Sequence, residues 1–251
     1  MPLNLLILGG TTEAAALCRR IAALGLPATV SLAGRVAAPA PLALPQRVGG
    51  FGGAKGLAEY IRTHRITHLI DATHPFAANI SANAVEASAV TRIPLVALTR
   101  PAWQPQPQDN WQVVPDMPAA VAALDRLSAR VFLAVGRMHL ADFAAHPQHF
   151  YLLRLIDPPQ TPLPFPHHHA LISRGPFTEA ADMALLTDHR IDLIVSKNSG
   201  GSGAIAKIAA ARALGLPVLM IDRPAIPPRA EVSSVDDVLA WLAHFGIDLG
   251  V

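Results

Sequence analysis

The stretch at the start of the chain, an apolar run followed by two glycines and two threonines, most constrains the fold. The run from Leu3 to Leu8 has the length and composition of a buried strand. Gly9, Gly10, Thr11 and Thr12 follow it, and helix-forming residues begin at Glu13. A strand, a tight glycine turn and a helix in this order are typical of the first unit of an open α/β sheet.

The same turn is a candidate phosphate site. A helix start presents unpaired backbone N–H groups and the positive end of the helix dipole, and glycine lets a phosphate approach them. Thr11 or Thr12 can cap the helix and donate a hydroxyl to the phosphate. The full G-x-G-x-x-G fingerprint is absent, because Glu and Ala occupy positions 13 and 14. We expect this turn to bind the pyrophosphate of a dinucleotide; the alternative is a plain β–α turn without a ligand.

Composition narrows the class of protein. The chain has 251 residues, 51% of them hydrophobic and 15% charged, which indicates a well-packed enzyme rather than a disordered chain. The net charge is only +2 and no long basic run occurs, so we expect no nucleic-acid partner. No apolar run reaches the roughly 18 residues of a membrane span, and no basic segment precedes the first apolar run as in a signal peptide. We therefore expect a cytoplasmic protein that does not bind membranes.

The lone cysteine, Cys18, excludes an intramolecular disulfide and a cysteine-based zinc site. It lies on the apolar side of the first expected helix. We interpret it as a core residue and expect no metal.

Strands and helices alternate along the whole chain, which predicts an α/β protein with mainly parallel sheets. A segment rich in proline and glutamine, residues 100–108, interrupts the alternation. We place a domain boundary there. The prediction is two Rossmann-like domains, residues 1–101 for a cofactor and residues 102–251 for a substrate. The sequence leaves open whether each half keeps its own last strand or exchanges one with the other.

The residues after the second expected strand, 28–32, indicate which dinucleotide is bound. Sites for NAD usually place a carboxylate there to bind the ribose, yet no Asp or Glu occurs between Glu13 and Glu59. The segment offers Ser31, Arg35, Arg47 and Lys55 instead. An arginine can bind a 2′-phosphate with two hydrogen bonds. We therefore predict NADPH, with Ser31 and Arg35 at the 2′-phosphate; alternatively Arg35 is a solvated loop residue.

The third expected strand, 67–71, ends in Asp71, Thr73 and His74, and Pro75 suits the first turn of the next helix. Ligands of open α/β sheets bind at the carboxyl ends of strands. His74 can there donate a hydrogen bond or a proton to a substrate. The alternative is a histidine that only caps the helix.

Strand ends in the second half carry basic residues and glycines. Because parallel strands share a carboxyl edge, these groups are expected to gather there and to bind phosphate or several carboxylates. The alternative is scattered surface charge. The glycine-rich loop lacks P-loop spacing, so an ATPase of that class is not expected. The candidate residues are Gly136, Arg137, Arg174, Gly175, Ser196, Lys197, Asn198, Ser199 and Gly200.

Three consecutive histidines, His167 to His169, follow a proline-rich loop. Three neighbours in sequence cannot all face one metal ion. We expect them in a solvated loop.

Four of these motifs, taken together and in order, resemble the precorrin-6A reductase family of corrin-ring (vitamin B12) biosynthesis. The motifs are Gly-Gly-Thr-Thr-Glu-Ala at 9–14, Asp-Ala-Thr-His-Pro-Phe-Ala at 71–77, Arg-Gly-Pro-Phe at 174–177 and Ser-Lys-Asn-Ser-Gly at 196–200. The resemblance implies an NADPH-dependent oxidoreductase acting on a CH–CH group, which reduces one ring double bond of precorrin-6A to give precorrin-6B. It also implies two Rossmann-like halves with the active site in the cleft between them.

For this reaction we assign residue roles as hypotheses. Thr73 and His74 would orient the nicotinamide or the ring edge, and Lys197 or His74 would supply the proton. The substrate is a macrocycle with many carboxylate arms, which Arg137, Arg174, Lys197, Asn198, Ser199 and Gly200 would bind. Candidate partners are neighbouring cobalamin-pathway enzymes, and the expected state is a monomer or a weak homo-oligomer.

Three other functions stay open at this point. One is the same reductase acting on the cobalt-containing ring of the anaerobic route, using NADH. Another is a non-catalytic NADPH-sensing Rossmann protein, which leaves the basic edge of the second half unexplained. The third is a two-domain sugar-nucleotide enzyme, which should bind UDP-type ligands instead of NADPH.

Overall fold

The computed structural model describes residues 2–34 and 41–246, which fold as two compact units. Unit 1 comprises residues 1–101 and 225–251, and unit 2 comprises residues 102–224. The first segment of unit 1 ends at Pro101. The last segment of the chain, from residue 225, belongs to unit 1 and not to the unit formed by residues 102–224.

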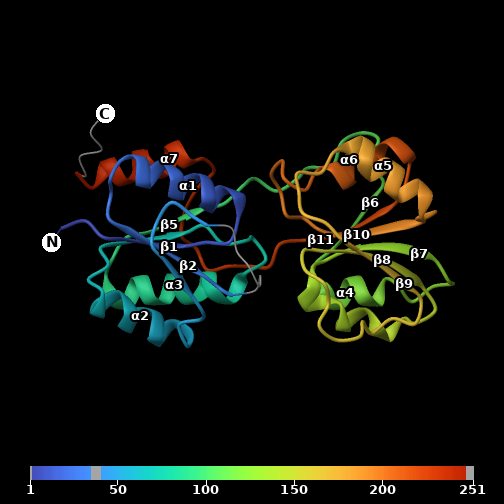
Figure 1. The fold of residues 1–251 in the computed structure, drawn as a ribbon, viewed down its shortest axis with the longest axis horizontal. Helices are drawn as coiled ribbons and strands as arrows, with labels where there is room; N and C mark the ends of the chain where they lie inside the picture. The colour runs from blue at the N-terminus through green and yellow to red at the C-terminus, as the bar shows by residue number, and fades with distance from the viewer. Residues whose placement is uncertain (1, 35–40, 247–251) are drawn as a thin grey trace. The chain divides into compact units, whose positions relative to one another are not determined.

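Unit 1 is built on a sheet of six parallel strands (Figure 1). Its spatial order is β12-β5-β4-β1-β2-β3, which is the order of a dinucleotide-binding Rossmann sheet. The strand order reverses between β1 and β4. The strands are β1 (Leu5–Leu8), β2 (Ala28–Leu32), β3 (Gln46–Val48), β4 (His68–Asp71), β5 (Leu95–Leu98) and β12 (Ala230–Val232).

Helices cover both faces of this sheet, so its central strands are apolar on both sides. α1 (Thr12–Ala23) and α7 (Val235–His244) lie on one face, and α2 (Gly53–Thr63) and α3 (Ala78–Thr91) on the other (Figure 1). Leu5 and Ile7 of β1 pack toward α1 and α7, while Leu6 and Leu8 pack toward α2 and α3. Cys18 is fully buried in the first of these cores, as expected.

Unit 2 contains a second sheet of six parallel strands in the order β6-β11-β10-β7-β8-β9. α5 (Glu179–Asp188) and α6 (Ala206–Leu214) cover one face. The other face carries α4 (Met117–Ala122) and the short 3-10 helices η1 (Arg137–His139) and η2 (Ala141–Ala145) (Figure 1). The strands are β6 (Trp111–Val114), β7 (Arg130–Ala134), β8 (Phe150–Leu155), β9 (His168–Ile172), β10 (Leu193–Lys197) and β11 (Val218–Ile221).

The two sheets exchange their outermost strands relative to a simple tandem arrangement. In unit 2, β7 to β11 follow the Rossmann order, and the sixth position is taken by β6, which precedes them in the chain. In unit 1 the sixth position is taken by β12, which follows the whole of unit 2 and pairs with β5. Val232 pairs with Leu98, so the return of the chain completes the first sheet.

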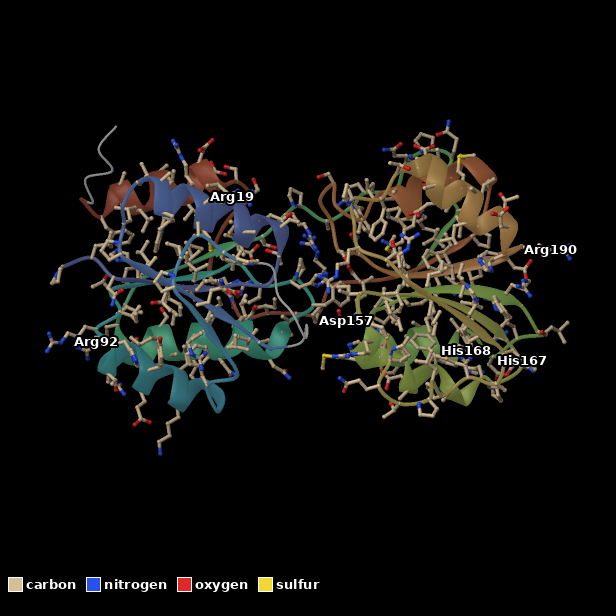
Figure 2. The ribbon with its side chains drawn as sticks, viewed as in Figure 1. Arg19, Arg92, Asp157, His167, His168 and Arg190 are labelled. Atoms are coloured by element: carbon tan, nitrogen blue, oxygen red, sulfur yellow. The ribbon has the colours of Figure 1, made fainter. Side chains whose placement is uncertain are left out.

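The histidine triplet differs from the expected loop. His168 and His169 belong to β9, and His169 stacks on His189 with ring centroids 4.9 Å apart. His168 is the first residue of β9, and His167 immediately precedes the strand. Figure 2 shows them on the side of unit 2 that carries Arg190, away from Asp157.

Across the described ranges, none of the helices combines the length and the apolar character that crossing a bilayer demands.

Candidate functional site

Each sheet has a topological switch point, which is the place where the strand order reverses. The connections that leave the two strands at this point run toward opposite edges of the sheet. These points lie between β1 and β4 in unit 1 and between β7 and β10 in unit 2. Open α/β sheets bind ligands in the crevice at the carboxyl ends of such strands. The predicted site residues of unit 1 follow β1, β2 and β4, and most of those of unit 2 follow β7 and β10.

The turn after β1 is held by the Thr11 side chain. Its hydroxyl accepts a hydrogen bond from the Ala14 backbone N–H (3.0 Å) and donates one to the Ala72 carbonyl (2.9 Å). Thr11 therefore caps α1 and ties the loop after β1 to the loop after β4. The Thr11 hydroxyl donates its hydrogen to Ala72, and the Thr12 hydroxyl donates to Glu13 Oε2 (3.2 Å), so the backbone N–H groups of this turn are the donors that it presents to a phosphate.

The two glycines of this turn have different roles. A Cβ on Gly9 would lie 2.9 Å from Cγ2 of Val30, so the turn packs closely against β2. Gly10 has a φ of +121°, which disfavours other residues, and no atom lies within 4 Å of the position a Cβ would take. Gly10 is exposed, so the turn presents backbone to an incoming group.

Glu13, in the first turn of α1, places a carboxylate close to this candidate phosphate site. Burial acts to raise its pKa, but its backbone hydrogen bond and the Arg100 charge outweigh burial and hold that pKa below its usual value. Arg100 Nη1 lies 2.9 Å from Glu13 Oε2. The ion pair offsets a charge that would otherwise repel a phosphate.

Ser31, the next-to-last residue of β2, is almost fully buried (6% exposed), and Arg47 of β3 binds it. Arg47 Nη1 donates to Ser31 Oγ (2.7 Å) and to the Gly49 carbonyl (3.0 Å), and Nη2 donates to the Gly50 carbonyl (3.1 Å). The guanidinium also lies 3.9 Å from the Phe51 ring centroid. A fixed positive charge thus stands at the end of β2. The other predicted residue of this site, Arg35, lies outside the described residues.

Asp71 forms the polar centre of the loop after β4. It is buried and accepts hydrogen bonds from the Thr73 backbone N–H (3.1 Å), the Thr73 hydroxyl (2.6 Å) and the Ser81 hydroxyl (2.6 Å). Arg229, which immediately precedes β12, pairs with its second carboxylate oxygen. These contacts fix the loop that carries Thr73 and His74.

The His74 ring is oriented by the backbone that follows it. Nδ1 accepts a hydrogen bond from the Phe76 N–H (3.2 Å). In the neutral ring the proton is therefore on Nε2, and this atom can donate a hydrogen bond. His74 is half-buried beside the first switch point, where the sequence predicts it.

In unit 2, Asn198 holds the crossover segment against the loop after β10. Its side-chain amide accepts from the Trp103 N–H (2.8 Å) and donates to the Trp103 carbonyl (3.0 Å), and Trp103 Nε1 donates to Gly201 O (2.7 Å). Arg223 donates to the carbonyls of Asn198 (3.0 Å) and Ser199 (3.2 Å). The Asn198 side chain is thus engaged in fixing the shape of the loop that presents Lys197 and Ser199.

The remaining predicted residues of unit 2 lie along the carboxyl edge of its sheet. Lys197 is the last residue of β10, and Gly200 is buried in the loop after it with a φ of +70°. Arg137 is exposed and begins the 3-10 turn after β7. Arg174 follows β9, is 54% exposed and pairs with Asp157 at 2.8 Å. Figure 2 shows Asp157 at one edge of unit 2 and Arg190 at the opposite edge.

Sequence reasoning did not commit to the arginines that organise these loops. Arg47 lies within the three-residue strand β3, and only the lack of nearby carboxylates drew attention to it. Arg229 and Arg223 act on partners 158 and 25 residues away, so no local pattern could reveal them. Within the described ranges, no group of three or more His, Cys, Asp or Glu side chains is arranged to hold a metal ion.

The fold and these polar strand ends define a two-unit Rossmann-type α/β protein. The sequence matches, over residues 4–243, the family described as Precorrin-6x reductase CbiJ/CobK. The chain belongs to this family.

Individual proteins of the family are similar over nearly the whole chain. The precorrin-6A reductase of Rhodobacter capsulatus is 54% identical over 243 residues, which cover 97% of each chain. A solved structure, "CobK precorrin-6A reductase", matches with a TM-score of 0.93 at 54% identity, again over 97% of each chain. The cobalt-precorrin-6A reductase of Priestia megaterium is 28% identical over 255 residues, which cover 96% of this chain and 98% of that one.

Proposed function

We propose that this chain reduces precorrin-6A to precorrin-6B with NADPH in cobalamin biosynthesis. The reaction adds one hydride and one proton across a single carbon–carbon double bond of the macrocycle, and NADPH leaves as NADP⁺. The observation that carries the proposal is the 54% identity, over 97% of both chains, to a protein named precorrin-6A reductase. The same proposal gives a use to both polar strand edges.

Unit 1 has features that fit a dinucleotide. The turn after β1 offers exposed backbone at Gly10 and the start of α1, which suit a pyrophosphate. Ser31 and Arg47 stand at the end of β2, where a Rossmann site meets the adenosine ribose. A guanidinium there, instead of a carboxylate, favours a 2′-phosphate and hence NADPH over NADH. When bound, NADPH supplies the hydride.

Residues of this chain are left with binding, orientation and proton transfer. His74 Nε2 carries a proton in the neutral tautomer, so it can donate to the substrate or to the nicotinamide amide. Lys197 is the other candidate proton donor. Thr73 is oriented by Asp71 and has an acceptor oxygen, so we assign it to the cofactor side. Arg137, Arg174, Lys197 and the Ser199–Gly200 backbone are assigned to substrate carboxylates.

The cobalt-containing substrate is the main alternative. Relatives named cobalt-precorrin-6A reductase share much less of the sequence, as the 28% identity to the Priestia protein illustrates. The difference favours the metal-free ring for this chain.

The test is to mix purified protein with precorrin-6A and either NADPH or NADH and to follow absorbance. Loss of the nicotinamide band together with a shift of the macrocycle spectrum, faster with NADPH, is the expected result. Faster loss with NADH would keep the reductase and reject the 2′-phosphate assignment. Binding of NADPH without oxidation would favour a sensor. Cobalt-precorrin-6A in a parallel reaction tests the alternative ring.

A further inference from the structure

A small pocket in unit 2 brings two basic side chains together at the carboxyl edge of the sheet. Its volume is about 130 Å³. Two of its lining residues carry positive charge, and the others are apolar or glycine. The lining residues are Phe132, Ala134, Gly136, Arg154, Phe177, Ala204 and Lys207.

Lys207 occupies an electrostatically unfavourable place. It is the second residue of α6, where the positive end of the helix dipole opposes a cation, and only 7% of its surface is exposed. The ammonium donates to the Ala204 carbonyl (2.8 Å) and lies 4.8 Å from the Trp103 ring centroid. An anion in the pocket would be attracted both by this ammonium and by the helix start.

Arg154 is held rigidly in the opposite wall. It projects from the apolar strand β8 and pairs with Asp182 of α5, whose side chain is 3% exposed. Its guanidinium lies 4.2 Å from the Phe177 ring centroid and 5.2 Å from that of Phe132. A planar, pre-oriented donor of this kind suits a carboxylate better than a mobile surface arginine does.

We propose that this pocket binds one carboxylate arm of the substrate, through Lys207 and with Arg154 in its wall. The inference rests on the proposed function, and it adds two residues to the basic edge. The pocket is too small for a macrocycle, but a carboxymethyl or carboxyethyl group matches its size and charge. It also adjoins the predicted edge in the chain, since Gly136 precedes Arg137 and Phe177 follows Arg174 by three residues.

The same chemistry could serve a phosphate of NADPH, so the test measures the two ligands separately. Tryptophan fluorescence follows the titration of wild type and Lys207→Met with precorrin-6A alone and with NADPH alone. The substrate Kd should rise about 10- to 100-fold in the variant, and the NADPH Kd should stay within twofold. In turnover, the substrate KM should rise with little change in kcat. A shift confined to NADPH, or no shift in substrate affinity, would overturn the proposal.

Two further proteins make the result decisive. Arg190→Met removes an exposed positive charge from the opposite edge of the same unit (Figure 2) and should leave both affinities unchanged. Lys207→Gln, which keeps a polar side chain but loses the charge, replaces Lys207→Met if that variant does not fold. If wild type reduces precorrin-6A and the Lys207 variant binds precorrin-6A with unchanged affinity, the pocket proposal is rejected and the proposed function stands. Wild type that neither binds nor reduces precorrin-6A would reject the proposed function.

Discussion

Arg229 and Asp71, 158 residues apart in the chain, form a buried ion pair at the end of β4. Their side chains are 6% and 1% exposed. Arg229 lies at the start of β12, the strand that returns from unit 2, while Asp71 holds the loop of Thr73 and His74. The ion pair therefore links β12, which completes the first sheet, to the loop that carries Thr73 and His74.

Removing Arg229 should destabilise the protein strongly. Arg229→Met leaves the Asp71 charge buried without this partner, at a cost of roughly 3–5 kcal/mol in the free energy of unfolding. Urea denaturation measures this. The double variant Arg229→Met with Asp71→Asn should recover much of the loss, because no buried charge then lacks its partner. Asp142→Asn, which removes a half-exposed partner of His139, is the matched control and should change stability by less than about 1 kcal/mol. Equal losses in the single and double variants would contradict this account.

Arg47 should determine which nicotinamide dinucleotide is preferred. Arg47→Met removes the positive charge beside Ser31, so the NADPH KM should rise about 10- to 100-fold with little change in kcat. The KM for NADH should change far less. The ratio of the two kcat/KM values is the measurement, and Lys55→Met on α2 serves as the control.

Arg35→Ala should act in the same direction, by about 1–3 kcal/mol. An unchanged ratio in both arginine variants would remove them from the cofactor site.

His74 should affect the chemical step if it donates a proton. His74→Ala should lower kcat by roughly 10²-fold or more. His74→Gln, which can donate a hydrogen bond but cannot transfer a proton at neutral pH, separates orientation from acid catalysis. If His74 only orients a ligand, the Gln variant should retain most of the activity. A wild-type kcat in His74→Ala, with its pH profile unchanged, would leave His74 a structural role.

His68 should make the fold less stable in mild acid. Burial lowers its pKa in the native state, and among the described residues its Nε2 atom is buried without a hydrogen-bond partner. As pH falls below about 6.5, the unfolded chain therefore binds a proton before the native chain does, and stability falls by at most about 1.4 kcal/mol per pH unit. His68→Phe keeps the ring contacts with Trp241 and Phe245 and should flatten this dependence. The comparison is urea denaturation at pH 5 to 7.5, with the exposed His167→Phe as control.

Cys18 should be inert in the folded protein. Burial raises the pKa of its thiol to about 11, so the thiolate is scarce at pH 8, and the side chain is fully covered. A thiol reagent should therefore modify no cysteine in native protein and one in urea. Between pH 9 and about 11 the unfolded chain loses this proton first, so stability should fall through that window. Rapid modification of Cys18 in the native protein at pH 8 would contradict this and would show that the core between the first sheet and α1 opens easily.

The sequence was sufficient for the α/β class, the parallel sheets and the central strands, because strands such as Leu5–Leu8 and Leu193–Lys197 are apolar and buried on both faces over nearly their whole length. It was not sufficient for β3, β6 and β12. These are edge strands of three or four residues, exposed on one side, and only pairing with a neighbour defines them. The exchange of outermost strands escaped prediction for the same reason.

The candidate site divides in a similar way. Residues directly after central strands, such as Gly10 and His74, could be picked out because strand ends in parallel sheets collect ligands. The residues that shape those loops could not, since Arg229 and Trp103 reach their partners only through the tertiary fold. Arg154 gave one local signal that went unused: a charged residue inside the apolar run of β8 must have a buried partner, and Asp182 provides it.

The place of β12 in the first sheet has a consequence for synthesis on the ribosome. Unit 1 contains the start of the chain but is completed last. Its sixth strand, β12, emerges only after all of residues 102–224 have been made. Until then β5 has an open edge and Asp71 lacks Arg229. Unit 2, whose six strands are contiguous in the chain, has its full sheet available first, so the unit assigned to the substrate is finished before the one assigned to the cofactor.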